Sequence, residues 1–283
     1  MAYEIGWFST GRDEAARDLL QAVYERIEDG TIKAEMAFVF SNRERGEDRE
    51  SDRFFDLVDG YGIDLVCFSS RRFKPQMRRR GLEETRQMGK DSELLRRWRR
   101  EYDREIMKRL EGYNPDLNVL AGYMLITGDQ ICRRYRMINL HPAAPGGPKG
   151  AWQEVIWQLI GSGAEATGVM IHLVTEALDE GPPITYCTFP IKEGHFQPLW
   201  EDLARKLRER PLSRIEEEEG ESNPLFREIR RQGVIRELPL LIHTIRTFTE
   251  GRIKIAGERV SVDGRPCDRG YDMTAEIDEQ ISR

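Results

Sequence analysis

Asn139 and His141 stand two residues apart at the end of a short apolar run, directly before Pro142. Residues two apart on an extended segment point to the same face, so we expect these two polar side chains to lie together. An amide beside an imidazole can hold a carbonyl oxygen that becomes negative under attack, and the imidazole can also carry a proton. Taken alone, however, the pattern is more often a polar strand end closed by hydrogen bonds.

A second polar group follows further along the chain. His172 lies inside an apolar run, and Asp179 lies in a turn closed by Gly181 and Pro182. A carboxylate near His141 would orient the imidazole ring and stabilise its charged form. His172 alone is more often a buried histidine whose hydrogen bonds are satisfied. Together, the two groups are the residue types that could act on a carbonyl at one site.

These side chains need a scaffold that brings strand ends together. Apolar runs that alternate with helical patterns, such as Asp13–Ile27, predict a parallel sheet covered by helices on both faces. We therefore expect an α/β fold with a doubly wound, mostly parallel sheet, which binds its ligands at the carboxyl ends of the strands. The first five predicted strands are Tyr3–Phe8, Glu35–Phe40, Ile63–Phe68, Leu117–Ala121 and Met137–Leu140.

The second half of the chain predicts strands, one helix and a looser C-terminal part. We expect residues 1–210 to form the catalytic domain, with residues 211–283 packing on it as an extension. The elements expected here are strands at Ala166–Thr175 and Pro183–Phe189, a helix at Pro198–Arg210, an exposed acidic loop at Leu212–Asn223, a helical segment at Leu225–Thr249 interrupted at Gly233 and Pro239, a hairpin at Arg252–Asp263 and a loose tail at Arg269–Arg283.

The segment Arg71–Arg109 is crowded with arginine. One interpretation is a patch that binds anions or RNA. The other, which we favour, is a solvated amphipathic helix, because glutamates alternate with the arginines throughout. The residues expected to face inward are Leu94, Leu95, Trp98, Tyr102 and Ile106.

Composition excludes several classes of protein. The 283 residues carry 44 basic and 50 acidic side chains, a formal net charge of -6, which disfavours a general nucleic-acid binder. No stretch approaches the roughly 20 apolar residues of a membrane span. The first residues contain Glu4 and no basic segment, so no secretory signal is expected. The four cysteines are widely spaced without a CxxC pair, which predicts a reducing cytoplasm and no metal site.

The paired motifs Asn-x-His-Pro and His-x-x-Thr-x-x-Leu-Asp-x-Gly-Pro resemble those of the folate-dependent formyltransferases. The resemblance covers about residues 4–210, resumes near 232–266, and is strongest to the purine-pathway branch of the family. It implies a Rossmann-like fold and an enzyme. Further landmarks in matching order are Val39–Asn42, Tyr102–Glu105, Pro115–Asp116, Val119–Met124 and Gly251–Ile253.

The resemblance also implies roles for individual residues. The formyl donor would be 10-formyltetrahydrofolate, no metal would be needed, and the acceptor would be a primary amine, with 5′-phosphoribosylglycinamide as the default. Asn139 would hold the formyl oxygen, His141 would support the oxyanion and proton transfer, and Asp179 would orient His141 and a proton-relaying water. The residues implied around the folate are Met124, Leu125, Ile126, Thr127, His172, Thr175, Ala177 and Glu180.

The sequence departs from the family in the loop after the first strand. Purine-pathway members carry a glycine-rich turn there that cradles the acceptor's phosphate, whereas this chain has Thr10, Gly11, Arg12 and Asp13. These four residues are the candidates for binding the acceptor. The loop still opens a helix, whose N-terminus can hold an anion, and Arg12 could add a contact. The equally weighted alternative for Thr10 and Asp13 is simple capping of the helix.

A second departure is the loop Ala143–Gln153 that follows the histidine. Lys149 in this loop could bind an anion and Trp152 could pack on a ring, or the two residues could serve loop closure and core packing. The third departure is extra length around Phe73–Arg97 and Leu212–Leu225. Together, the departures leave the identity of the acceptor open.

Other functions remain as alternatives. One is a formyltransferase for a different amine. Another is a 10-formyltetrahydrofolate hydrolase, although relatives of that type carry a regulatory domain before the catalytic fold and here the first strand is expected at Tyr3. A transferase acting on initiator tRNA would add a C-terminal barrel, which the residues after Leu225 do not resemble. A binding protein without catalysis is disfavoured by the intact Asn139, His141 and Asp179. We expect small-molecule partners, no membrane or nucleic acid, and leave a homodimer through the last long helix open.

Overall fold

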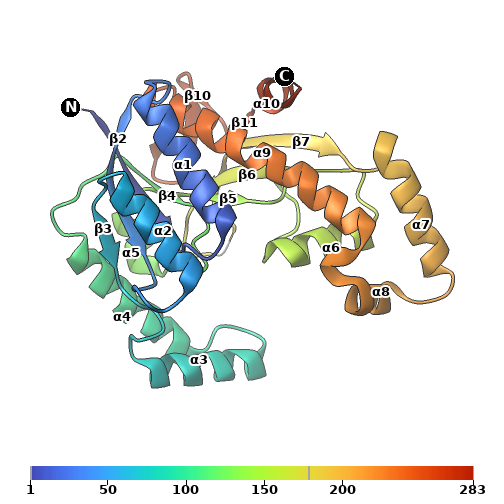
Figure 1. Cartoon of the computed structure of the whole chain (residues 1–283), viewed down its shortest axis with the longest axis horizontal. Helices are drawn as coiled ribbons and strands as arrows, with labels where there is room; N and C mark the ends of the chain where they lie inside the picture. The colour runs from blue at the N-terminus through green and yellow to red at the C-terminus, as the bar shows by residue number, and fades with distance from the viewer. Residues whose placement is uncertain (1, 178, 283) are drawn as a thin grey trace. The chain divides into compact units, whose positions relative to one another are not determined.

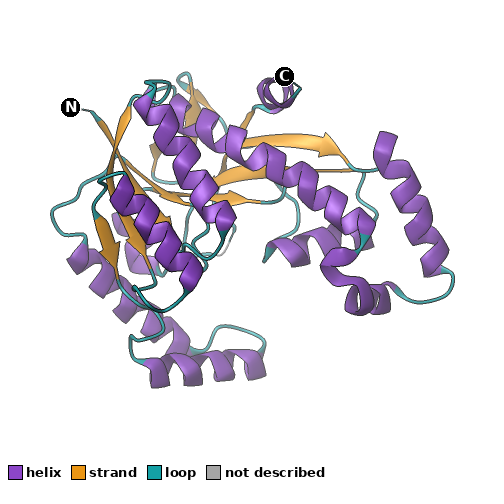
Figure 2. Ribbon diagram, in the orientation of Figure 1, coloured by secondary structure: helices purple, strands orange, loops and turns teal. Residues whose placement is uncertain are grey.

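The computed structural model describes residues 2–177 and 179–282, so Leu178 of the second motif lies outside the described residues. The chain divides into two compact units (Figures 1 and 2). Unit 1 comprises Met1–Asn139 and Leu173–Glu180, and unit 2 comprises Leu140–His172 and Gly181–Arg283. Each unit is described in turn.

Unit 1 contains a parallel sheet with the strand order β5-β4-β1-β2-β3. This confirms the predicted α/β class and the five predicted strands. The strands are β1 (Tyr3–Ser9), β2 (Ala34–Ser41), β3 (Leu65–Cys67), β4 (Leu117–Leu120) and β5 (Met137–His141), whose last two residues fall in unit 2. The helices are α1 (Glu14–Glu28), α2 (Arg49–Gly60), α3 (Pro75–Met88), α4 (Glu93–Arg109) and α5 (Asp129–Arg134).

The central strand β1 explains why the apolar runs are continuous. Ile5, Trp7 and Phe8 are all inaccessible to solvent, because both faces of the strand are covered. In Figure 1, α1 and α2 lie in front of the strands of this unit and α4 and α5 lie behind them. This division follows from right-handed crossovers, since the chain runs from β1 to β3 in one direction and returns through β4 to β5.

The arginine-rich segment forms two helices, α3 and α4, as the favoured interpretation predicted. Four of the five residues expected to face inward are buried, and the fifth, Leu94, is half-buried. Helix α3 packs closely on α4 because Gly81 has no side chain: a Cβ there would lie 2.9 Å from the Cα of Leu95. Ser92 joins the two helices, since its hydroxyl donates to the Gly81 carbonyl at 2.9 Å and accepts from the Leu95 amide at 3.0 Å.

Unit 2 carries an antiparallel pair, β6 and β7, with β11 parallel to β7, and a separate antiparallel sheet of order β10-β9-β8. The hairpin expected at Arg252–Asp263 is confirmed as β8 and β9, and β10 adds a strand that was not predicted. The elements are α6 (Trp152–Ser162), β6 (Ala166–Leu173, its last residue in unit 1), β7 (Pro183–Pro190), η1 (Gly194–Phe196), α7 (Gln197–Leu207), α8 (Leu212–Glu219), η2 (Gly220–Ser222), α9 (Pro224–Thr249), β8 (Ile253–Ala256), β9 (Arg259–Val262), β10 (Arg265–Pro266), β11 (Tyr271–Asp272) and α10 (Thr274–Ile281).

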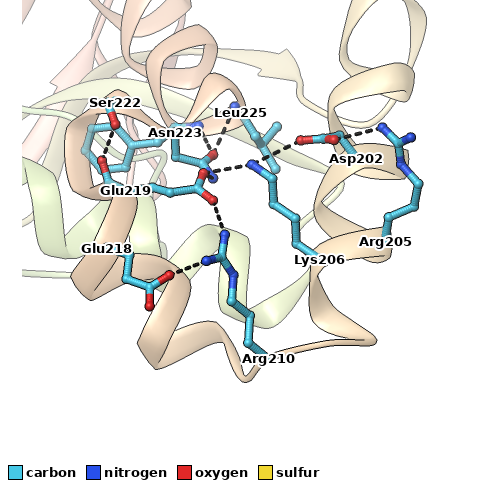
Figure 3. Close-up of polar contacts among 10 residues, drawn as sticks. Asp202, Arg205, Lys206, Arg210, Glu218, Glu219, Ser222, Asn223 and Leu225 are labelled. Atoms are coloured by element: carbon cyan, nitrogen blue, oxygen red, sulfur yellow. Dashed lines mark hydrogen bonds and ion pairs between the residues drawn. The ribbon is translucent and has the colours of Figure 1, made fainter.

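The exposed loop expected at Leu212–Asn223 is wrong, because this segment forms α8 and η2. Two features stabilise the helix. Ile215 is fully buried in an apolar cluster formed with α6, α7 and α9. The acidic side chains are paired: Glu219 accepts from Lys206 at 2.8 Å and from Arg210 at 2.6 Å, and Glu218 also pairs with Arg210 (Figure 3). The acidic run is therefore one side of an ion-pair network.

The interruption expected at Gly233 and Pro239 is also wrong, because α9 runs unbroken through both residues for 26 residues. An internal proline costs a helix about 3 kcal/mol. Buried residues on both sides of Pro239, including Phe226 and Leu241, anchor the two halves by tertiary packing. No helix within the described residues is both long enough and apolar enough to span a membrane.

The loose tail expected at Arg269–Arg283 is wrong as well. Its described part forms β11, which pairs with β7, and α10. The Met273 amide donates to the Tyr186 carbonyl at 2.8 Å, and the Thr274 hydroxyl accepts from the Thr188 amide at 3.0 Å. Ile277 is fully buried. These contacts join the end of the chain to a strand nearly a hundred residues earlier, which no local pattern reveals.

Candidate functional site

His141 and His172 lie together in unit 2. Their ring centroids are 6.0 Å apart with the planes nearly perpendicular, and each side chain is 2% exposed. His141 is the last residue of β5 and His172 lies near the end of β6. His172 therefore packs against the ring of His141, although it lies inside an otherwise apolar strand.

The loop after His141 fixes the position of a proton. The Nε2 of His141 lies 3.0 Å from the backbone carbonyl of Pro148. A carbonyl can only accept, so Nε2 carries the hydrogen and a neutral ring has its lone pair on Nδ1. The loop returns over the histidine through a turn in which the Gly147 amide donates to the Ala144 carbonyl at 2.9 Å. Gly146 takes the positive φ of 78° that this turn requires.

Two residues of this loop were candidates for contacts with the acceptor. Trp152 instead packs against the apolar cluster of unit 2, with its ring centroid 5.8 Å from that of Phe226 and the Arg230 guanidinium over it at 4.7 Å. This confirms the core-packing interpretation for Trp152. Lys149 is exposed, and its carbonyl accepts from Gln158 at 3.4 Å.

Asn139 and Asp179 belong to unit 1. Asn139 pairs in register with Leu120, the last residue of β4, so it lies beside the loop that follows β4. Asp179 is half-buried and adopts a left-handed backbone conformation, with φ of 52°. A non-glycine residue in this region is uncommon and carries local strain, which is a frequent feature of functional turns.

The turn that carries Asp179 is built by its own polar groups. The Thr175 hydroxyl donates to the Ala177 carbonyl at 3.3 Å, and the same carbonyl accepts from the Glu180 amide at 3.3 Å. The Val174 amide donates to the Met137 carbonyl at 2.9 Å, which fastens the turn to β5. Glu180 and Ala177 are exposed. Thr175, predicted as the end of a strand, thus lies beyond β6 and orders the turn.

The loop after β4 exposes apolar side chains. Met124 is 51% exposed and Ile126 is 37% exposed, whereas Leu125 between them packs against the apolar core of unit 1. Exposed apolar residues at a strand end form a surface on which a flat ring can lie. The Thr127 hydroxyl lies 3.3 Å from the Cys132 sulfur, and that sulfur is 3.7 Å from the Thr175 carbonyl. This chain of contacts joins the loop to the turn of Asp179.

The loop after β1 is closed by internal hydrogen bonds. The buried Thr10 accepts the Met124 amide on its hydroxyl at 2.8 Å, and its own amide donates to the Gly122 carbonyl at 3.1 Å. The Gly11 amide donates to the Ser9 hydroxyl at 3.1 Å. Gly11 has φ of 61°, and any side chain there would meet Phe54 at 2.8 Å. These amides are engaged within the loop, unlike those of an open phosphate cradle.

Asp13 and Arg12 follow at the start of α1. Asp13 caps the helix, since its carboxylate accepts from the Ala16 amide at 3.1 Å. This confirms the capping interpretation for Asp13. It is wrong for Thr10, whose hydroxyl accepts from the Met124 amide instead. The Arg12 guanidinium lies 3.6 Å from the Asp13 carboxylate, and both side chains are about half exposed. Arg12 is thus the basic side chain that the loop carries at the start of α1.

Three groups of the two units received no role from the sequence, although Asp103 falls within the landmark Tyr102–Glu105. The Pro148 carbonyl is a backbone group and has no side-chain signal. Cys132 was considered only as an unpaired cysteine, yet it bridges the loop and the turn. Asp103 is 3% exposed, and its Oδ2 lies against the backbone of Gly128, where a Cβ would be 2.3 Å away. A buried charge on an otherwise apolar helix face is the signal that could have identified it.

The Asp103 carboxyl is fastened under the loop after β4. Burial raises its pKa to about 7, against the opposing effect of the backbone amides of Gly128 and Ile131 at the start of α5. Asp103 is thus a buried acid with a raised pKa that lies against Gly128, the residue that follows the segment Met124–Thr127.

Each unit therefore gathers a part of the predicted site. Unit 1 brings the loop after β1, the loop after β4, Asn139 and the Asp179 turn to the carboxyl ends of its parallel strands, where such sheets bind ligands. Unit 2 holds His141, His172 and Lys149. Unit 1 is thus a doubly wound α/β unit with polar groups at the carboxyl ends of its strands, and unit 2 contains the buried pair of histidines.

The chain belongs to the formyl transferase family, whose family model, described as "Formyl transferase", matches residues 14–210. Among curated relatives, phosphoribosylglycinamide formyltransferase of Escherichia coli is 35% identical over 120 residues, which cover 40% of this chain and 56% of the relative. The chain spans about half the length of this and other phosphoribosylglycinamide formyltransferases among its curated relatives.

Solved structures share the fold. The phosphoribosylglycinamide formyltransferase of Coxiella burnetii superposes with a TM-score of 0.64 at 21% identity, covering 96% of this chain and 99% of that one. A formyltetrahydrofolate deformylase of Burkholderia mallei superposes with a TM-score of 0.58 at 19% identity, covering 93% of this chain and 70% of that one. At these identities the likeness concerns the fold, and the activity has to be argued from the site.

Proposed function

We propose that this protein transfers a formyl group from 10-formyltetrahydrofolate to a primary amine, with 5′-phosphoribosylglycinamide of purine biosynthesis as the acceptor. The observation that carries the proposal is the complete set Asn139, His141 and Asp179 within a chain of the formyl transferase family. The name of the Escherichia coli relative supports the choice of acceptor.

Formyl transfer to an amine needs donors at the carbonyl oxygen and a base for the attacking nitrogen. The amine lone pair forms a bond to the formyl carbon, and the carbonyl electrons move onto the oxygen. In our proposal, the Asn139 amide and the Nδ1–H of a protonated His141 ring donate to that oxygen, while the Nε2–H of His141 stays on the Pro148 carbonyl. Asp179 keeps the ring of His141 oriented and, through water, accepts the proton that the nitrogen loses.

The leaving nitrogen of the folate must gain a proton as its bond to carbon breaks. When the oxyanion collapses, the carbonyl re-forms and the electron pair of the broken bond returns to that nitrogen. His141 in its charged form, or a water ordered by Asp179, can supply the proton. The hydrogen held on Nε2 by the Pro148 carbonyl leaves Nδ1 as the nitrogen that gains and loses a proton.

The folate fits the loop after β4 in this proposal. Met124 and Ile126 offer exposed apolar surface to a pterin ring, and backbone groups of this loop and of the turn around Ala177 offer donors and acceptors to its edge. The contacts of Cys132 with Thr127 and with the Thr175 carbonyl would hold the loop after β4 and the turn around Ala177 at a fixed separation. Leu125 supports the slot from the core rather than by direct contact.

The acceptor's phosphate has fewer donors here than an open glycine-rich cradle would give. The Gly11 and Met124 amides are engaged, so we assign phosphate binding to Arg12 and the first-turn amides of α1. Arg12→Ala should raise KM for phosphoribosylglycinamide by about tenfold, the value of one charge-assisted contact, with kcat nearly unchanged. Arg26→Ala, at the far end of the same helix, is the matched control.

Folate turnover followed by absorbance tests the proposal. The wild-type protein should consume 10-formyltetrahydrofolate only when phosphoribosylglycinamide is present. Turnover without an acceptor would replace the proposal with hydrolysis, the activity named for the Burkholderia mallei structure. Binding of the folate without turnover in either case would mean that the acceptor is another amine.

A further inference from the structure

A cavity of about 290 Å³ lies along helix α3 in unit 1, apart from every residue of the candidate site. Its walls come from the end of the loop before α3 and from successive turns of the helix. Basic side chains dominate the lining, which consists of Arg71, Pro75, Arg78, Arg79, Leu82, Glu83 and Arg86.

The arginines of this cavity differ from those of the neighbouring helix α4. On α4 the arginines have acidic partners, as in Arg97 with Glu101 at 3.0 Å and Arg109 with Glu105 at 2.9 Å. Among the described residues, by contrast, no carboxylate lies within ion-pair distance of any arginine that lines the cavity. Four guanidinium groups therefore share one acidic neighbour in the lining, Glu83.

Arg78 is held in place rather than freely solvated. Its guanidinium lies 5.5 Å from the centroid of the Trp98 ring, and Trp98 is itself fixed by a hydrogen bond from its Nε1 to the Phe73 carbonyl at 2.9 Å. Burial and the nearby charge of Arg71 both lower the pKa of Arg78. The two arginines thus repel each other in the absence of an anion, which a negative ligand would relieve.

The start of α3 adds further donors. Pro75 occupies the first turn, and Lys74 before it makes no side-chain cap. The first-turn amides of α3 therefore have no partner from a side-chain cap, and the helix begins at Pro75, which lines the cavity. The helix has 14 residues, so its dipole also favours negative charge at this end.

We propose that this cavity binds a small molecule carrying a diphosphate or triphosphate group. Four arginines against one glutamate leave a net positive lining that requires several negative charges, and guanidinium forks match phosphate oxygens. The volume suits a small ligand. A single nucleic-acid strand would instead need exposed aromatic platforms, and no aromatic residue lines the cavity, since Trp98 beneath Arg78 is 1% exposed.

Isothermal titration calorimetry of the full chain with pyrophosphate, ATP and AMP, at constant ionic strength, tests this proposal. Pyrophosphate and ATP should bind more tightly than AMP, because they carry more charge. Arg78→Gln should weaken binding of pyrophosphate by about tenfold or more. The matched control is Arg80→Gln, which removes the same charge from the same helix at an exposed position outside the lining and should change affinity by less than about twofold.

Three results would overturn the proposal: absence of pyrophosphate and ATP binding, equal weakening by Arg78→Gln and Arg80→Gln, or tighter binding of a short single-stranded RNA than of ATP. Arg71→Gln serves as a second lining variant if Arg78→Gln loses its fold, judged by circular dichroism. Formyl transfer measured without added polyphosphate should be unchanged in all of these variants. The outcome here is therefore separate from the fate of the proposed activity.

Discussion

At the residue scale, the chemistry depends on which nitrogen of His141 holds a hydrogen. The Pro148 carbonyl fixes the hydrogen on Nε2, and His172 packs edge-on against the ring. The imidazole is thereby restricted to one orientation. A fixed donor or acceptor aimed at a developing charge stabilises a transition state more than a mobile one, because no reorganisation is needed during the reaction.

Asn139→Ala and His141→Ala should each lower kcat for formyl transfer by about 10²–10³, the usual cost of losing an oxyanion donor. Folate affinity should change little, because the exposed apolar residues of the loop after β4 remain. Steady-state kinetics, with a parallel binding titration of a dideazafolate, would show the loss of kcat and the retained folate affinity. The control is His243→Gln, a change on α9 at a histidine whose ring is hydrogen-bonded to Gln280 of α10. Near wild-type turnover in His141→Ala would contradict the assigned role.

Asp103 gives a pH-dependent contribution to stability. Its pKa in the folded chain is raised to about 7, above that of an unfolded aspartate, so its contribution is fully present below pH 4 and is lost as pH rises through 7. Relative to Asp103→Asn, the wild-type free energy of unfolding should fall by roughly 2–3 kcal/mol between pH 5 and pH 8. Urea unfolding of both proteins at the two pH values measures this difference. Parallel pH profiles would exclude an elevated pKa at this carboxyl.

At the element scale, α8 shows how an acidic run becomes a helix. Figure 3 shows Glu219 between Lys206 and Arg210, with the Asn223 side chain donating to it at 2.9 Å. These pairs join α7, the connection after it, α8 and the start of α9. Asn223 also caps α9 by accepting from the amides of Leu225 and Phe226. One carboxylate thus connects three helices.

Glu219→Gln should lower the free energy of unfolding by about 1 kcal/mol, because it removes the charge from a partly solvated network. The positive partners lower the pKa of Glu219, so this contribution is present above the pKa of an unfolded glutamate and is lost as pH falls through the lower folded value. The control is Glu217→Gln. Glu217 lies on the same helix, is exposed and takes no part in the ion-pair network, so its replacement should have almost no effect. Thermal unfolding at low and high salt would separate the two variants.

At the scale of the whole molecule, both sequence motifs cross the division between the units. The division falls between Asn139 and Leu140 in the first motif, and between His172 and Leu173 in the second. Asn139 of the first motif and Asp179 of the second both lie in unit 1, so a ligand that contacts them would stabilise the folded state of that unit by mass action.

A dideaza analogue of 10-formyltetrahydrofolate should raise the unfolding temperature of the whole chain. At a concentration about 100 times its Kd, the analogue should stabilise the protein by about 2.7 kcal/mol. Met124→Asp should abolish the shift by placing a charge on the apolar surface proposed for the pterin. Val234→Asp, at a similarly exposed apolar position on α9, should leave it intact. If the analogue still raised the unfolding temperature of Met124→Asp, the folate would have to bind somewhere other than the loop after β4.

The predictable part of the fold was the part that local patterns encode. Continuous apolar runs identified all five strands of unit 1, most plainly β4, whose four residues are all buried. The spacing of Leu95, Trp98 and Tyr102 identified α4 in the same way. The continuity of α9 through Pro239 was not predictable, because packing outweighs the local cost of a proline. The loop after β1 also needed the structure, which engages the Gly11 amide with Ser9.

The sequence by itself determined the type of sheet and the family motifs, because burial pattern and residue identity are properties of short segments. Only the tertiary structure decided which polar groups are engaged and which are available. It bonded Pro148 to His141, turned Asp13 into a helix cap, paired the acidic run of α8 and left the arginines along α3 unpaired. Each of these depends on groups that the folded backbone brings within about 3 Å, a distance that sequence spacing does not encode.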